Sequence, residues 1–132
     1  MKSFKLKIVT PDGLLFDSEV ESLLVRTDDG DVEFLAGHID YMASLGTGRA
    51  RIKVDGADKY ASVSGGFVTV KGGEVTLVAV TFEFRENINL ERAKAAMDAA
   101  KSEISTAMDD KALAIAKAKL SRAMNRIGVA EM

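Results

Sequence analysis

Three arginines in the last third of this 132-residue chain have the spacing of a binding site. Arg122 and Arg126 are four residues apart, so on a helix they share one face. Arg92 and Arg122 are equally far from residue 107, near the expected turn of a helical hairpin, so we expect them at a similar height. Three guanidinium groups gathered in this way would bind a phosphate-bearing ligand. The alternative is a solvated basic face in which each arginine pairs with nearby acidic side chains.

Residues that could form a catalytic or metal site are few. His38 is the single histidine and lies in an expected loop, where hydrogen-bonding or interface roles are commoner than catalysis. Asp28, Asp29 and Asp31 form an acidic cluster, but the other ligand positions of a calcium loop are missing, which favours a solvated turn. Ser64 lacks the sequence context of a nucleophile elbow. We therefore expect no catalytic residue and no metal site.

The composition excludes further classes of protein. The chain has no cysteine, which removes disulfides, thiolate metal sites and thiol nucleophiles. Its formal net charge of −2 is unlike that of a general nucleic-acid binder, which is usually strongly basic. No apolar run approaches the roughly 20 residues that span a bilayer, and the alternating start does not form a signal peptide. We expect a cytoplasmic protein that neither binds nucleic acid nor inserts into a membrane.

The region before residue 87 holds all the aromatic residues and most glycines, and it predicts β-strands. Phe4, Leu6 and Ile8 alternate with other residues, and residues 63–70 and 75–82 are rich in β-branched side chains. Turns with glycine separate such segments at 11–13, 28–30, 55–56 and 72–73. We predict a sandwich or flattened barrel of about 80 residues.

Residues 87–132 are rich in alanine and predict two antiparallel helices, each about 15–18 residues long, with a break at 105–110. Each helix has one apolar stripe in which large residues alternate with alanine, so the helices can pack closely. The stripe residues are Leu90, Ala93, Met97, Ala100 and Ile104, then Leu113, Ala116, Leu120, Ala123 and Ile127. Asn87 or Asn89 is expected to cap the first helix, and Asp109 or Asp110 the second. Gly128 is expected to close the second helix.

Such a hairpin has little core of its own, so we expect it to dock weakly and to be able to change position. Acidic residues outnumber basic ones before residue 87, and basic residues outnumber acidic ones after it. The second helix therefore offers a cationic surface suited to an acidic partner. Its cations are Lys111, Lys117, Lys119, Arg122 and Arg126.

Short motifs in a fixed order run through nearly the whole chain. In the first half they are residues 10–13 with Phe16, Gly37-His38, Leu45 with Gly48, and residues 64–67 with Val70. In the second half they are residues 88–93, 120–123 and 125–127. With these motifs in this order and spacing, the chain resembles the epsilon subunit of the bacterial F-type ATP synthase.

The resemblance implies a ten-stranded β-sandwich over residues 1–86 and a regulatory helical hairpin over residues 87–132. It implies a non-catalytic central-stalk subunit that binds the gamma subunit and the membrane rotor ring, turns with them, and couples ion flow to ATP synthesis. When the hairpin of this family extends, its basic helix contacts acidic segments of the alpha and beta catalytic subunits and inhibits ATP hydrolysis. The location implied is peripheral, at the cytoplasmic face of the cell membrane.

The resemblance also implies residues for two sites. Gly30, Asp31 and His38 match positions that contact the rotor ring and the gamma subunit. Residues 88–93 match a motif that binds ATP as a regulatory ligand in some bacterial members, with Asn89 in place of the motif's aspartate. The implied ATP-binding set is Glu83, Asn89, Arg92, Arg122 and Arg126. No cofactor is required.

Two hypotheses from other classes remain beside this one. The first is a free-standing ATP-sensing module that binds nucleotide through Arg92, Arg122 and Arg126, which titration with ATP would test. The second is a small enzyme, for which the sequence offers only His38 and scattered carboxylates.

Overall fold

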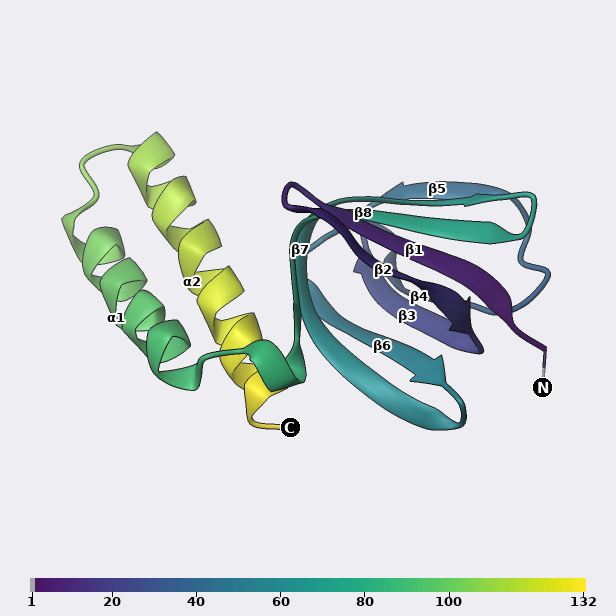
Figure 1. Ribbon diagram of the computed structural model, residues 1–132. Helices are drawn as coiled ribbons and strands as arrows, with labels where there is room; N and C mark the ends of the chain where they lie inside the picture. Colours follow the sequence, from purple (N-terminus) through teal and green to yellow (C-terminus); the bar gives the residue numbers. More distant parts are fainter. Residues whose placement is uncertain (1) are drawn as a thin grey trace. The chain divides into compact units, whose positions relative to one another are not determined.

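The computed structural model describes residues 2–132, which divide into two compact units at the boundary between Phe84 and Arg85. The first unit consists of strands, and the second of a short 3-10 helix followed by two α-helices (Figure 1). The strands are β1 (Phe4–Thr10), β2 (Gly13–Val20), β3 (Ser22–Thr27), β4 (Gly30–Phe34), β5 (Tyr41–Ser44), β6 (Gly48–Val54), β7 (Ala57–Lys71) and β8 (Glu74–Phe84). The helical elements are η1 (Arg85–Asn87), α1 (Leu90–Thr106) and α2 (Asp110–Ala130).

The strands pair in the order β2-β1-β8-β7-β6-β3-β4, with β5 also on β7. All pairs are antiparallel except β1 with β8. The first half of β7 pairs with β6 and its second half pairs with β5 on the same edge, so β7 contributes to both layers of the sandwich. The predicted β-sandwich is confirmed. In the described residues it has eight separate strands rather than ten, because β7 and β8 each run continuously from one layer to the other.

The change of layer in β7 occurs at Gly65 and Gly66. Both have positive φ angles, +73° and +102°, which residues with a side chain rarely adopt. A Cβ atom on Gly66 would overlap the carbonyl oxygen of Val78 on β8. The two glycines therefore allow the paired strands β7 and β8 to bend together while remaining in contact.

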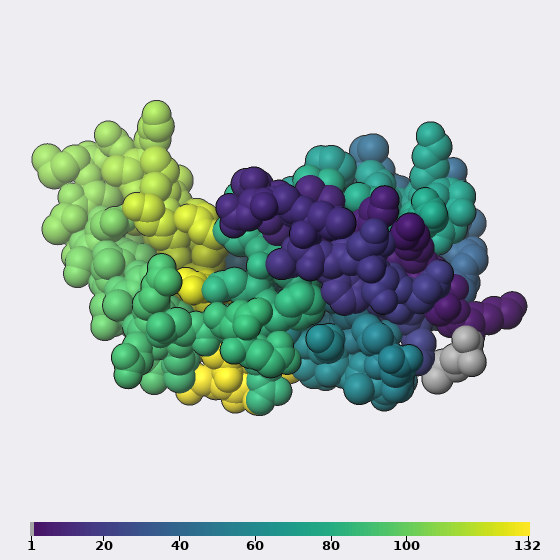
Figure 2. Space-filling view, in the orientation of Figure 1, coloured from purple at the N-terminus to yellow at the C-terminus, as the bar shows by residue number. Residues whose placement is uncertain are grey.

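The core of the sandwich comes from the alternate residues of its strands. Leu6 and Ile8 on β1, Ile52 on β6 and Leu77 on β8 are fully buried. Burial of each such side chain contributes roughly 2–3 kcal/mol. In the space-filling view, purple and indigo atoms of the chain's first strands form part of the visible surface of the sandwich (Figure 2). The period of two in the sequence therefore correctly identified the inner face of β1.

The two helices begin at side-chain caps. Asn89 Oδ1 accepts a hydrogen bond from the backbone N–H of Arg92 at 3.0 Å, and Asp109 Oδ1 accepts one from Ala112 at 2.7 Å. Each cap satisfies one of the donors that a helix N-terminus leaves unpaired. For each helix the sequence left two candidate capping residues, and the structure confirms Asn89 for α1 and Asp109 for α2. The helices have 17 and 21 residues, so the second is longer than expected.

The additional length of α2 comes from its C-terminal end, where the expectation for Gly128 is wrong. Gly128 lies inside the helix, which continues to Ala130 and is capped by Glu131. Its φ angle is not positive, unlike that of a glycine that ends a helix in a left-handed turn.

The predicted apolar seam between α1 and α2 is confirmed. All ten stripe residues are buried or half-buried. The alanines among them are the most deeply buried: Ala93, Ala100, Ala116 and Ala123 are at most 2% exposed. Alanine at these positions allows close packing, but each alanine buries little apolar area.

Candidate anion-binding groove and sandwich loops

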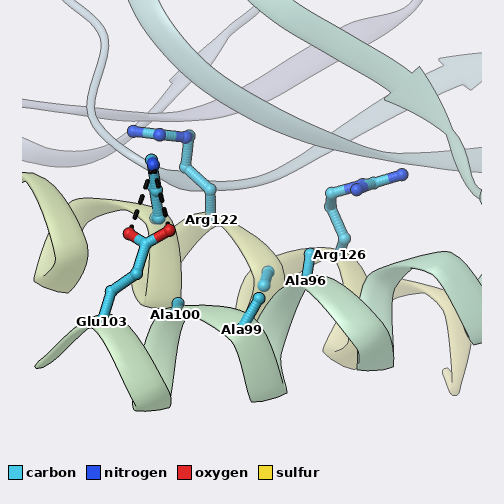
Figure 3. A pocket seen from close by; sticks show the side chains of 8 residues that line it. Ala96, Ala99, Ala100, Glu103, Arg122 and Arg126 are labelled. Atoms are coloured by element: carbon cyan, nitrogen blue, oxygen red, sulfur yellow. Dashed lines mark hydrogen bonds and ion pairs between the residues drawn. The ribbon is translucent and has the colours of Figure 1, made fainter. Parts of the chain in front are cut away.

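A groove of about 250 Å³ lies along one side of the α1–α2 hairpin. Its base is formed by small side chains, and its polar groups come from both helices (Figure 3). The residues that line it are Ala96, Ala99, Ala100, Glu103, Lys119, Arg122, Ala123 and Arg126. Lys119, Arg122 and Arg126 all come from α2, where their spacing of three and four residues places them on one face. A groove with three cations and a base without bulky side chains is suited to an extended anion.

The third predicted arginine, Arg92, lies outside this groove. The ion pair between Glu103 and Lys119 marks one level at which the two antiparallel helices meet, and counting three residues along each helix from it puts Ala100 level with Arg122. Arg92 is eight residues before Ala100, which corresponds to roughly 12 Å along the helix. Arg92 is therefore not level with Arg122, contrary to the sequence-based expectation.

The cause is the conformation of the connection between the helices. Ala107 and Asp109 have extended backbone angles, with ψ of 128° and 172°. The chain therefore continues beyond the end of α1 before α2 begins, and the first residues of α2 have no counterpart on α1. The sequence-based prediction placed the turn symmetrically about residue 107, so it did not include the shift of α2 along α1 that the extended connection produces.

The ion pair in the groove joins the two helices directly. Lys119 Nζ lies 3.2 Å and 3.4 Å from the two carboxylate oxygens of Glu103 and donates to both. Both side chains are 47% exposed. In Figure 3, Arg122 and Arg126 extend from α2 on the same side as this pair.

The other residues of the implied ATP-binding set lie at the start of α1 and in the sandwich. Asn89 precedes α1, where its side-chain oxygen is already used by the cap on the backbone of Arg92. Glu83 belongs to β8 of the sandwich unit, where it pairs with Ser62 of β7. The hairpin groove therefore brings together Arg122 and Arg126 from the implied set, together with Lys119 and Glu103, which the set did not include.

The remaining cations of α2, Lys111 and Lys117, are exposed on the helix surface. Lys111 is eight residues before Lys119 and shares its face of the helix, whereas Lys117 is two residues before Lys119 and lies on the opposite side.

Gly30 and Asp31 are the first two residues of β4, directly after the β3–β4 turn of the sandwich. Gly30 has a φ angle of +100°, and its carbonyl oxygen accepts a hydrogen bond from the Thr27 hydroxyl at 2.9 Å. Asp31 accepts from Arg26 Nε at 2.6 Å and from its Nη2 at 3.5 Å. This hydrogen bond, together with the carboxylate charge, raises the pKa of Arg26 above its ordinary value. Asp31 is thus held on the strand next to its own.

His38 packs in an aromatic group with Phe34 and Tyr41. Its ring centroid lies 4.9 Å from that of Phe34 and 5.9 Å from that of Tyr41. Its Nδ1 atom is 2.7 Å from the carbonyl oxygen of Ile39; a carbonyl only accepts, so Nδ1 carries the hydrogen. The Tyr41 hydroxyl donates to Asp29 at 3.2 Å, which connects this group to the β3–β4 turn. The aromatic group around His38 is therefore linked to the turn that directly precedes the strand containing Asp31.

Within residues 2–132, no group of three or more histidine, aspartate and glutamate side chains is placed to hold a metal ion. Ser64 Oγ is 2.9 Å from the hydroxyl of Thr47.

The sequence-based reasoning did not identify a row of apolar side chains on the outer face of the sandwich. Phe67 on β7 pairs with Val78 on β8, Val78 with Val9 on β1, and Val9 with Leu14 on β2. Phe67 is 43% and Leu14 61% exposed. The available signal was the adjacent pair Leu14-Leu15, because a strand with one buried face rarely needs two consecutive large apolar residues.

The two units match the two parts of one protein family, in order. Residues 3–85 match the beta-sandwich domain of the ATP synthase delta/epsilon chain, and residues 86–131 match its long alpha-helix domain. The chain therefore belongs to the ATP synthase delta/epsilon chain family.

Relatives within this family are epsilon chains. The ATP synthase epsilon chains of Bacillus velezensis and Bacillus subtilis are each 42% identical to this chain over 130 residues, covering 98% of both sequences in each comparison. These relatives confirm the resemblance to the epsilon subunit of the F-type ATP synthase.

A solved structure has the same fold. A chain in the cryo-EM structure of the Euglena gracilis mitochondrial ATP synthase, OSCP/F1/c-ring in rotational state 1, superposes with a TM-score of 0.80 at 24% identity. The match covers 93% of this chain and 78% of that one. Across the described residues, neither α1 nor α2 has the length and hydrophobicity that a bilayer-spanning helix requires.

Proposed function

We propose that this chain is a non-catalytic rotor subunit in the central stalk of an F-type ATP synthase, where it couples ion flow to ATP synthesis. The observation that carries the proposal is the match of both units, in order and over nearly the full chain, to the two domains of the delta/epsilon family. Its proposed partners are the gamma subunit and the membrane rotor ring. Its proposed location is peripheral, at the cytoplasmic face of the cell membrane.

The sandwich is the proposed site of contact with the rotor. Gly30 and Asp31 at the start of β4 and His38 in the loop after β4 are held by hydrogen bonds and aromatic packing, which suits a contact that transmits torque. The exposed apolar row from Phe67 to Leu14 supports a second contact, with the gamma subunit, because exposed apolar patches commonly mark protein interfaces.

The hairpin is the proposed inhibitory element. When it extends, the basic side chains of α2 would meet acidic segments of the alpha and beta catalytic subunits. These side chains are Lys111, Lys117, Lys119, Arg122 and Arg126. The most deeply buried residues of the seam between the helices are alanines, which bury little apolar area and support a hairpin able to move as a unit or to open at low cost.

Deletion of residues 87–132 tests both parts of this proposal. In the assembled ATP synthase, the shortened chain should still associate with the gamma subunit and should increase the rate of ATP hydrolysis. An unchanged rate would contradict inhibition by the hairpin and leave the coupling role intact. Failure of the full-length chain to co-purify with a gamma subunit would contradict the rotor role itself.

A second function, regulatory ATP binding, is favoured by the groove that contains Arg122 and Arg126. Isothermal titration of the full chain with MgATP tests it, and the double substitution R122A/R126A should abolish the signal. No heat at millimolar MgATP would contradict nucleotide binding and leave the rotor role unaffected. The same titration separates this function from a free-standing sensor, which would bind ATP but not a gamma subunit.

A further inference from the structure

One acidic side chain lies among the cations of the hairpin groove. Of the described residues that line it, Glu103 is the acidic one, facing Lys119, Arg122 and Arg126. Its two carboxylate oxygens accept hydrogen bonds from Lys119 at 3.2 Å and 3.4 Å. The Glu103 carboxylate thus pairs with the Lys119 ammonium group, which could otherwise bind an anion in the groove (Figure 3).

We propose that Glu103 is an internal competitor for the phosphate groups of a ligand in this groove, and that Lys119 is the additional phosphate-binding residue that it masks. This inference rests on the second proposed function, the binding of ATP near Arg122 and Arg126. Phosphate and carboxylate oxygens accept from the same ammonium donors, so a polyphosphate and Glu103 compete for Lys119. The carboxylate also repels any phosphate that approaches Arg122.

The ion pair can be exchanged because it is exposed. An ion pair between half-exposed side chains gains little in water, so an anion carrying several charges can displace it. Arg122 lies three residues after Lys119 and Arg126 four residues further, so an extended chain of phosphates can contact all three cations in turn. Glu103 therefore controls the access of such a ligand to Lys119.

The test compares two substitutions that remove the same charge from α1. Glu103→Gln removes the carboxylate in the groove, and Asp98→Asn removes one from an exposed position on the opposite side of the same helix. Full-length chains are titrated calorimetrically with MgATP and, separately, with inorganic tripolyphosphate. Helix content measured by circular dichroism confirms that each variant is folded.

We expect E103Q to raise the affinity for both ligands roughly three- to tenfold. D98N should change it by less than about twofold, because its charge is farther away and screened. Adding Lys119→Met to E103Q should remove the gain, whereas a carboxylate that acted only by general repulsion would leave it in place.

The outcomes separate this inference from the function on which it rests. If the wild type binds MgATP through Arg122 and Arg126 but E103Q binds no more tightly, the role of Glu103 is overturned while nucleotide binding stands. An equal gain in D98N, or a gain that survives K119M, also overturns it. If neither the wild type nor E103Q binds, both ideas fail together.

Discussion

Gly66 on β7 lies so close to the carbonyl oxygen of Val78 on β8 that a Cβ atom at this position would overlap it. The contact lies where both strands pass from one layer of the sandwich to the other. Gly66→Ala should therefore force the two strands apart, in addition to straining a backbone with a φ angle of +102°.

We expect Gly66→Ala to lower the free energy of unfolding of the sandwich by at least about 2 kcal/mol. Urea denaturation of the full chain, followed by circular dichroism, measures the loss. The control is Gly72→Ala, at a φ angle of +57° with nothing within 4 Å of the added Cβ, which should lose only about 1 kcal/mol. Equal losses in the two variants would contradict the steric argument.

Gly128→Ala should change stability in the opposite direction. Gly128 lies inside α2, its φ angle is not positive, and a Cβ there would meet nothing within 4 Å. Alanine lowers the entropy of the unfolded chain and favours the helix, so we expect a gain of about 0.5–1 kcal/mol. Thermal melting followed by circular dichroism at the helix band measures it. A loss of stability would mean that residue 128 ends the helix, as its sequence position first suggested.

The cap at Asn89 gives a third prediction. Asn89→Ala removes the acceptor for the Arg92 N–H and should destabilise the first turn of α1 by about 1 kcal/mol. Asn89→Asp keeps the acceptor and adds a charge that favours a helix N-terminus by about 0.5 kcal/mol. Amide hydrogen exchange in that turn distinguishes the variants. Asp109→Ala serves as the control, since it should loosen the start of α2 and leave the start of α1 unchanged.

Local sequence patterns predicted the inner face of a strand, the seam between the helices and the capping candidates, because neighbouring residues determine each of these features. Alternation identified the inward residues of β1, and the three- and four-residue stripes identified the helix seam. The capping candidates followed from short acceptor side chains, which left two residues open at each helix start, and the structure uses Asn89 and Asp109. The relative position of Arg92 and Arg122 could not be predicted in this way, because it depends on how far the chain at Ala107–Asp109 extends before α2 begins.

The Glu103–Lys119 ion pair in the groove also could not be predicted from local sequence patterns. The two residues are 16 apart in sequence, and only the packing of one helix against the other brings them together. The exposed row on the sandwich also depends on pairing between strands that are distant in sequence, such as β1 with β8. Sequence patterns identified single faces, whereas sites formed between elements required the fold.

The ion pair between Arg26 and Asp31 gives a prediction about the loops of the sandwich. Both side chains are about half exposed, at 52% and 54%, so Asp31→Asn should leave the free energy of unfolding nearly unchanged. If Asp31 contacts the rotor ring as proposed, the same substitution should reduce ion pumping driven by ATP hydrolysis in membrane vesicles. Unchanged pumping in a fully assembled complex would contradict that contact. Lys5→Met, which removes the surface ion pair with Asp17, is the control and should alter neither property.

The apolar row on the outer face of the sandwich gives the last prediction. Phe67→Thr replaces a 43% exposed aromatic ring with a residue that also favours strands, so the stability of the isolated chain should change by no more than about 1 kcal/mol. Binding to the proposed gamma partner should weaken at least roughly tenfold, because aromatic residues in apolar patches often dominate interface energy. Thr69, two residues along the same strand, is on the same face but outside the apolar row, so Thr69→Ala is the matched control. Pull-down and calorimetric titration with the gamma subunit measure both variants. Equal binding by F67T and T69A would place the partner on another surface of the sandwich.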